Sequence, residues 1–119
     1  MTQLTKKRPK YGKERSVRRC AFVASVEVTE RGSDTRLSGR VSELGMGGCY
    51  VDALNPFPKD AVLQVRIVRD QGAFEAEARV AHCDPRFGMG LAFTQMTPEH
   101  RGVLEGWLFE LVMLLKPEP

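Results

Sequence analysis

The chain has 119 residues, of which 42% are hydrophobic and 28% are charged, and its formal net charge is +3. This size and composition predict one globular domain with a single hydrophobic core. Three cysteines without a C-x-x-C pair argue against a disulfide framework and a zinc site, and they favour a cytoplasmic, reducing location. The N-terminus is charged and no apolar run is long enough for a bilayer, so neither a secretory signal nor a membrane span is expected.

Positive charge is concentrated at the N-terminus. The first 19 residues hold eight Lys or Arg residues against one Glu, whereas the rest of the chain holds ten basic and fourteen acidic residues. This asymmetry is typical of a protein with a polyanionic partner, although a solvated tail explains Lys6–Lys13 equally well. Residues 1–13 are polar, contain Pro9 and Gly12 and show no periodicity, which predicts a flexible basic arm. The folded domain is expected over residues 14–116.

The basic leader ends in Arg15-Ser16-Val17-Arg18-Arg19, just before the first hydrophobic run. An arginine side chain is permanently charged and presents a planar fork of N–H donors, which fits phosphate oxygens and the O6/N7 edge of guanine. Arg15 and Arg19 lie four residues apart and are joined to a folded domain. We therefore expect these two side chains to grip a small anionic ligand from one side.

Alternation of apolar and polar residues then predicts a series of β-strands. The predicted strands are residues 20–29, 35–42, 49–52, 61–69, 74–83 and 87–93. Turn residues separate them, among them Arg31–Asp34 and Asp70–Gly72, and the two prolines of Asn55–Asp60 exclude a central strand there. Turns at this near-regular spacing predict an antiparallel meander that closes into a small barrel or a sandwich.

A helix is predicted over residues 98–115. Thr97, Pro98 and Glu99 mark its start, since they supply an N-cap hydroxyl, a proline at the first helical position and an acid at the positive end of the helix dipole. Apolar residues then recur at helical spacing until Lys116 and Pro117. They are Val103, Leu104, Trp107, Leu108, Leu111, Val112 and Leu115. This broad stripe is expected to dock on the barrel, and its second half is apolar enough to face a second subunit as well.

The sequence offers little for catalysis. His82 and His100 are isolated, lie near no nucleophile in a recognisable motif and show no metal-ligand spacing, so we interpret them as a strand residue and a first-turn helix residue. Glu75 and Glu77 lie two apart on a predicted strand, where a solvated face explains them better than an acid–base pair. We therefore expect no enzyme, no metal and no cofactor.

A glycine-rich segment, Ser42–Tyr50, joins two predicted strands and contains Gly45, Gly47 and Gly48. Glycine permits positive φ angles and lets backbone N–H groups approach a ligand closely. The turn Glu43–Gly48 is therefore a candidate for the wall opposite the arginines, and the alternative is a tight bulged hairpin without a ligand. It is neither a Walker loop nor a dinucleotide fingerprint, because no Lys-Ser/Thr pair ends it and no helix follows.

Three motifs in this order, ahead of a C-terminal helix, resemble the PilZ domain family. The family's R-x-x-x-R motif matches Arg15 to Arg19, its (D/N)-x-S-x-x-G motif falls on Glu43–Gly48, and its G-x-G-hydrophobic-x-Phe strand matches Gly88 to Phe93. The resemblance covers about residues 14–115. It implies a mainly β fold, a six-stranded antiparallel β-barrel of the split-barrel type with a C-terminal α-helix. It also implies a receptor for the bacterial second messenger cyclic di-GMP.

The resemblance also implies a set of ligand-binding residues, in which the arginines clamp phosphates and guanine faces and the second motif reads a guanine edge. These residues are Arg15, Arg18, Arg19, Glu43, Gly45 and Gly48. Two of them depart from the family pattern. Glu43 keeps a carboxylate but adds a methylene, and Gly45 removes the serine hydroxyl. Each lost or misplaced hydrogen bond costs about 0.5–1.5 kcal/mol.

The leading hypothesis is a non-catalytic receptor whose arm folds over the barrel mouth around cyclic di-GMP and so changes a surface offered to a downstream protein. The missing serine and the apolar helix keep a second hypothesis open. It is a PilZ-type protein–protein interaction adaptor that has lost ligand binding, with a homodimer through the helix as one form of association. A nucleic-acid binder is the third alternative, and it is disfavoured because Tyr11 and Tyr50 are the only tyrosines and no aromatic ladder is present.

Overall fold

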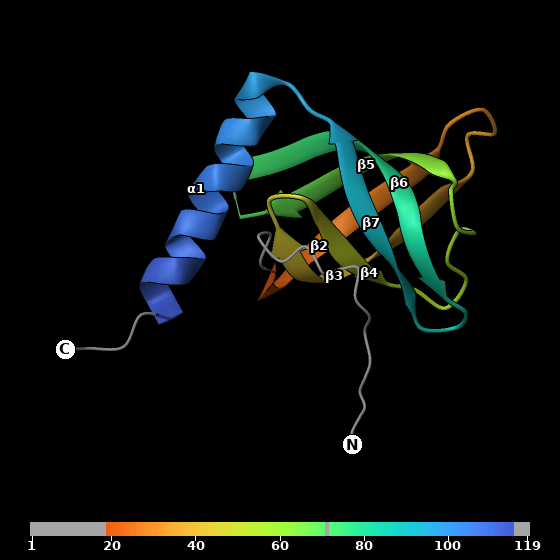
Figure 1. The fold of residues 1–119 in the computed structure, drawn as a ribbon, viewed down its shortest axis with the longest axis horizontal. Coiled ribbons are helices and arrows are strands. Elements are labelled where there is room, and N and C mark those ends of the chain that lie inside the picture. Colours follow the sequence, from red (N-terminus) through yellow and green to blue (C-terminus); the bar gives the residue numbers. More distant parts are fainter. Residues whose placement is uncertain (1–18, 71, 116–119) are drawn as a thin grey trace, which may run out of the picture.

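The computed structural model describes residues 19–70 and 72–115, and within them six strands form a closed antiparallel barrel with one helix packed beside it (Figure 1). The elements are β2 (Arg19–Glu30), β3 (Arg36–Gly45), β4 (Gly48–Asp52), β5 (Val62–Arg69), β6 (Gly72–Asp84), β7 (Gly88–Gln95) and α1 (Pro98–Leu115). The barrel and the C-terminal helix confirm the predicted fold class, and α1 has the predicted bounds. The predicted flexible arm, residues 1–13, lies outside the described residues, as do Arg15 and Arg18.

The strand order around the barrel differs from the predicted meander. The order is β2-β3-β4-β7-β6-β5, so β4 pairs with β7 rather than with β5, and β5 pairs with β2 to close the barrel. The physical reason lies in residues 53–61, between β4 and β5. Hairpin loops usually have roughly two to five residues, and this segment is longer and contains Pro56 and Pro58. It therefore crosses to another part of the barrel instead of turning back tightly.

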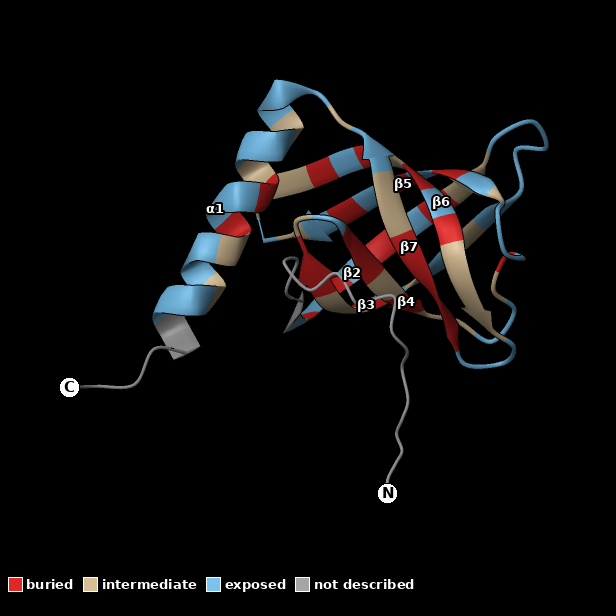
Figure 2. Ribbon diagram, viewed as in Figure 1, coloured by how far each residue is buried: buried red, intermediate tan, exposed pale blue. Residues whose placement is uncertain are grey.

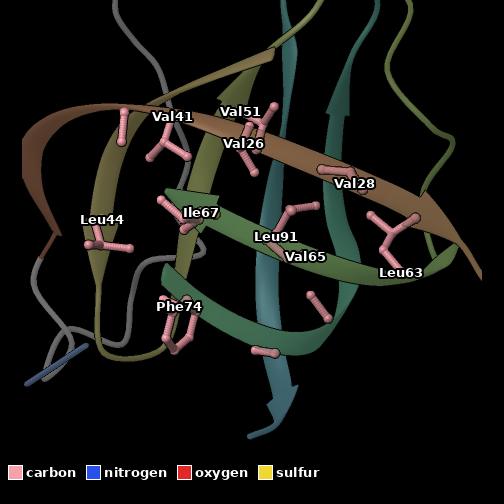
Figure 3. Packing of buried hydrophobic residues seen from close by; sticks show 14 of the residues in the cluster. Val26, Val28, Val41, Leu44, Val51, Leu63, Val65, Ile67, Phe74 and Leu91 are labelled. Carbon is pink, nitrogen blue, oxygen red and sulfur yellow. The ribbon is translucent and has the colours of Figure 1, made fainter. Parts of the chain in front are cut away.

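The inward faces of the six strands share one hydrophobic core (Figure 3). Every second residue of a strand points to the same side of the sheet, and this period of two is visible as alternating buried and exposed positions in Figure 2. Side chains from all six strands meet in the interior, among them Val26, Val28, Val41, Leu44, Val51, Leu63, Val65, Ile67, Phe74 and Leu91. The alternation predicted along residues 20–29 and 74–83 is confirmed.

Strand β3 is longer than predicted. The sequence predicted a turn over Glu43–Gly48, but β3 continues to Gly45 and β4 already begins at Gly48. Leu44 is fully buried and is the cross-strand neighbour of Cys49, which is buried too. Burial of these two side chains extends the ladder into the glycine-rich segment, and only residues 46 and 47 lie between the strands.

Helix α1 begins at the predicted cap and docks on the barrel through its first half. The backbone N–H of His100 donates to Thr97 Oγ1 at 3.2 Å, as expected for an N-cap residue. Leu104 is fully buried, and the Trp107 ring stacks on Phe22 of β2 with the ring centroids 5.6 Å apart. The helix therefore rests on the start of β2 as well as on β6.

The second half of α1 extends past the barrel, as Figure 1 shows. Phe109, Val112 and Met113 are 66%, 54% and 52% exposed. The predicted apolar stripe is thus docked only in part, since Val112 belongs to it and faces away from the core. Within the described ranges, no helix combines the length and the apolar character that crossing a membrane requires.

Candidate ligand-binding site

The start of β2 lies beside the end of β3. In the register of this pair, Arg19 is opposite Gly45, Cys20 opposite Leu44 and Ala21 opposite Glu43. Gly48, which opens β4, follows directly across the hairpin, so four of the predicted site residues come together at one end of the barrel: Arg19, Glu43, Gly45 and Gly48. Arg15 and Arg18 lie outside the described residues.

The glycine-rich hairpin is anchored by β7. The backbone N–H of Phe93 donates to the carbonyl oxygen of Gly47 at 2.8 Å, and Gly48 pairs with Ala92. The Phe93 ring in turn packs against Phe74 of β6, with the centroids 5.1 Å apart. The third predicted motif thus has a structural role, because the backbone of Phe93 holds the hairpin that carries the second motif while its ring packs on Phe74.

Glu43 begins a row of cross-strand neighbours on the outer face of the barrel. It is opposite Tyr50 of β4, Tyr50 is opposite Gly90 of β7, and Gly90 is opposite His82 of β6. The side chains of Glu43, Tyr50 and His82 are half-buried. A carboxylate, a phenol and an imidazole therefore follow one another along a line that starts at the glycine-rich hairpin.

Asp84 holds the two rings of this row. The Tyr50 hydroxyl donates to Asp84 Oδ2 at 2.6 Å, and His82 Nε2 lies 2.6 Å from Asp84 Oδ1. The Tyr50 ring also lies against the backbone of Gly88, where an added Cβ would sit 2.7 Å from Tyr50 Cε2. This cluster was not predicted from the sequence. Tyr50 has the outward parity of β4, but His82 has the parity of the buried residues Phe74 and Val80 and is turned outward by the bulge between Val80 and His82. The β4–β7 pairing, which is not local in sequence, then brings the two side chains together.

The other side chains considered for catalysis, His100, Glu75 and Glu77, make contacts that stabilise the fold. His100 lies in the first turn of α1, and its Nδ1 accepts a hydrogen bond from the backbone N–H of Glu75 at 3.1 Å. Glu75 also pairs with Arg66 at 3.1 Å, and Glu77 forms an ion pair with Arg31. These carboxylates lie on a solvated face, as interpreted from the sequence. In the part of the chain that the structure describes, no group of three or more His, Cys, Asp or Glu residues could hold a metal ion.

These observations define the class of protein as a small closed antiparallel β-barrel domain with a flanking helix and a glycine-rich hairpin beside an arginine. The family model of the PilZ domain matches residues 13–110. The chain therefore belongs to the PilZ domain family, a family of cyclic di-GMP receptors.

Solved structures share this fold at low sequence identity. The inhibitor of motility MotI/DgrA of Bacillus subtilis matches with a TM-score of 0.71 and 17% identity over 87% of this chain and 53% of MotI/DgrA, so this chain spans about half the length of that protein. The PilZ domain of Escherichia coli YcgR, solved with c-di-GMP, has a TM-score of 0.68 and 15% identity over 86% and 94% of the two chains.

The PilZ domain of CeSA from a cellulose-synthesizing bacterium has a TM-score of 0.63 and 20% identity over 79% of this chain and 97% of that chain. At these identities, the similarity to solved structures shows the fold alone. No curated protein sequence matches the chain significantly.

Proposed function

We propose that this chain is a non-catalytic cyclic di-GMP receptor in which Arg15 and Arg19 hold the ligand against the β3–β4 hairpin. The observation that carries the proposal is the β2–β3 register, in which Arg19 is the neighbour of Gly45. The R-x-x-x-R segment therefore leads into the barrel directly beside the second motif. Membership of the PilZ family supports the choice of ligand, and the YcgR domain of the same fold was solved with c-di-GMP.

The proposed roles follow from the chemistry of each group. The guanidinium groups of Arg15 and Arg19, with Arg18 beside them, make charge-assisted hydrogen bonds to the phosphates and guanine faces. The Glu43 carboxylate accepts hydrogen bonds from the N–H groups of a guanine edge. The hydroxyl missing at Gly45 costs about 0.5–1.5 kcal/mol, which is at most a roughly tenfold loss of affinity. Two charge-assisted arginine contacts outweigh that loss.

The proposed relay is an ordering of the arm that a downstream protein reads. Support comes from the short distance in sequence between the candidate site and the helix contact. Arg19 is the neighbour of Gly45, and Phe22, three residues further along β2, stacks on Trp107 of α1. A change at the first residue of β2 is therefore close to the contact that docks α1.

Titration calorimetry of the wild-type chain with cyclic di-GMP is expected to give a micromolar or lower Kd. Arg15→Ala and Arg19→Ala are each expected to weaken binding by more than about tenfold, because each variant removes a hydrogen bond to a charged group, worth about 1.5–3 kcal/mol. Arg101→Ala is the matched control. Its guanidinium is exposed on α1 beside Glu105, at 3.6 Å, and its loss should leave binding unchanged. No heat at several hundred micromolar ligand, or wild-type affinity in Arg19→Ala, would reject the proposal.

A second candidate function is that of an interaction adaptor without ligand, and the exposed apolar half of α1 favours it. Phe109 and Val112 lie three residues apart and are more than half exposed. In this case sedimentation velocity should show concentration-dependent association that Phe109→Glu or Val112→Glu abolishes, since a charge on this face cannot be buried without cost. Trp107 of the same helix is not suitable for this test, because it is buried against Phe22 and a glutamate there would disturb the fold itself. A monomer at every concentration would contradict self-association through this face.

A further inference from the structure

A cavity of about 740 Å³ lies at the end of the barrel opposite the glycine-rich hairpin. Three segments line it: the start of β3, the end of β4 together with residues 53–57, and the turn between β6 and β7. Strand β3 runs from Arg36 at this cavity to Gly45 at the hairpin, so the two sites are separated by its full length. In Figure 1 the segments around the cavity lie on the side of the barrel away from α1.

Two large apolar side chains stand at the mouth of this cavity. Leu54 is 76% exposed and Phe87 is 75% exposed. Their loops are joined by a hydrogen bond from the backbone N–H of Ala53 to the carbonyl oxygen of Phe87 at 3.0 Å. Leu37 and Phe57, which pack on the core, line the same cavity. A single exposed apolar side chain is ordinary, but a pair beside an apolar-walled cavity is typical of an interaction site.

The charge at the cavity mouth is positive. Arg36 and Arg86 both line it, and the ion pair of Arg36 with Glu27 is long, at 4.0 Å, and exposed on both sides. Arg86 forms no ion pair with any residue in the ranges 19–70 and 72–115. The one carboxylate of the lining, Asp52, is already paired with Arg40 at 3.3 Å. Two guanidinium groups thus remain able to receive carboxylates from a partner.

The backbone of Arg86 is strained. Its φ angle is 74°, in the left-handed region that side chains other than those of Asn and Asp rarely adopt. The other non-glycine residues with positive φ in the described part of the chain are Asp34, Asp60 and Asp70. A glycine would form the turn without this strain. Strain at such a position is commonly retained where a side chain has a function, and this turn presents Arg86 and Phe87 together at the cavity mouth.

The strand pairing leaves a short free edge at this cavity. Each of the six described strands has a neighbour on both sides, but the β3–β4 ladder begins at Arg40, so residues 36–39 of β3 have no strand partner on the β4 side. A protein that binds at this end also meets the exposed side chains of Leu54 and Phe87 at the cavity mouth.

We propose that this cavity is the docking site for a segment of a partner protein. The segment inserts one large apolar side chain between Leu54 and Phe87 and places carboxylates against Arg36 and Arg86. The area that the apolar side chain removes from water supplies most of the affinity, and the two arginines select acidic segments over basic ones. This proposal does not depend on ligand binding at the glycine-rich hairpin.

The test is a selection from a displayed library of random dodecapeptides on the full-length chain, followed by fluorescence anisotropy of the enriched peptides. The expected peptides share one aromatic or leucine residue flanked by Asp or Glu. Phe87→Ser and Arg86→Glu are each expected to weaken their binding at least tenfold. Val23→Ser, at a 71% exposed apolar residue of β2, is the matched control and should bind them like the wild type.

The variant Arg86→Gly distinguishes a loss of peptide binding from a loss of fold stability. This variant removes the strain and the charge together, so its thermal midpoint should rise while its peptide affinity falls. Cyclic di-GMP titrations of the same variants show whether the hairpin end is intact, which keeps a failure of docking distinct from a failure of ligand binding. Enriched peptides without carboxylates, or peptides that Phe87→Ser binds as tightly as the wild type, would overturn the proposal. So would the absence of any enriched peptide.

Discussion

Trp107→Ala is expected to lower the free energy of unfolding by about 3–5 kcal/mol, a large fraction of the stability of a small domain. Trp107 is 9% exposed, stacks on Phe22 and carries the contact between α1 and the start of β2. Its ring also lies over the backbone of Gly72 in β6, where an added Cβ would be 3.7 Å from Trp107 Cζ2. Alanine at this position leaves a cavity between the helix and the barrel that neither element can close.

Chemical denaturation followed by circular dichroism measures this loss, since the variant lacks the only tryptophan of the chain and has no tryptophan fluorescence. Phe109→Ala, at a 66% exposed position of the same helix, is the control, and it should change stability by less than about 0.5 kcal/mol. A loss below about 1 kcal/mol for Trp107→Ala would mean that α1 contributes little to the fold.

Gly88→Ala is expected to destabilise the barrel by about 3 kcal/mol, because the added methyl group has no space. A Cβ at this position would be 2.3 Å from the carbonyl oxygen of Val51 and 2.7 Å from Tyr50 Cε2. The first of these atoms is backbone of the neighbouring strand, so the β4–β7 ladder has to shift. Displacement of the Tyr50 ring would also break its 2.6 Å hydrogen bond to Asp84.

Thermal and urea unfolding of Gly88→Ala measure the effect, with Gly102→Ala as the matched control. Gly102 lies in α1, and an added Cβ there meets no atom within 4 Å. Because alanine is the better helix former, this control should be stabilised by about 1 kcal/mol. Equal stabilities for the two variants would show that the close approach at Gly88 is relieved without cost.

Local patterns predicted most of the fold. The period-two alternation along residues 20–29 identified the side of β2 that is buried, and the Thr97 cap with the stop at Lys116 and Pro117 identified both ends of α1. These signals depend on residues that are close in sequence. The order of the strands depends on contacts between distant segments, and the predicted meander was wrong because no local signal tells β4 to pair with β7.

Of the candidate site, the structure shows that some of the predicted residues lie together, and their role in ligand binding stays a prediction. The motif residues Arg19, Glu43 and Gly45 lie close together because they belong to the neighbouring strands β2 and β3. The ring cluster around Asp84 and the cavity beside Phe87 were not foreseen, because strands and loops far apart in sequence form them. Phe87 was predicted within a strand, and it lies in the turn before β7.

The crossing of residues 53–61 makes the barrel an assembly of two three-stranded halves, β2–β4 and β5–β7, joined at the seams β4–β7 and β2–β5. Either half alone would leave two unpaired edge strands and an apolar face that the other half buries in the closed barrel. We therefore expect unfolding to be a single cooperative event, and a chain cut within residues 53–61 to form the barrel only when its two fragments recombine.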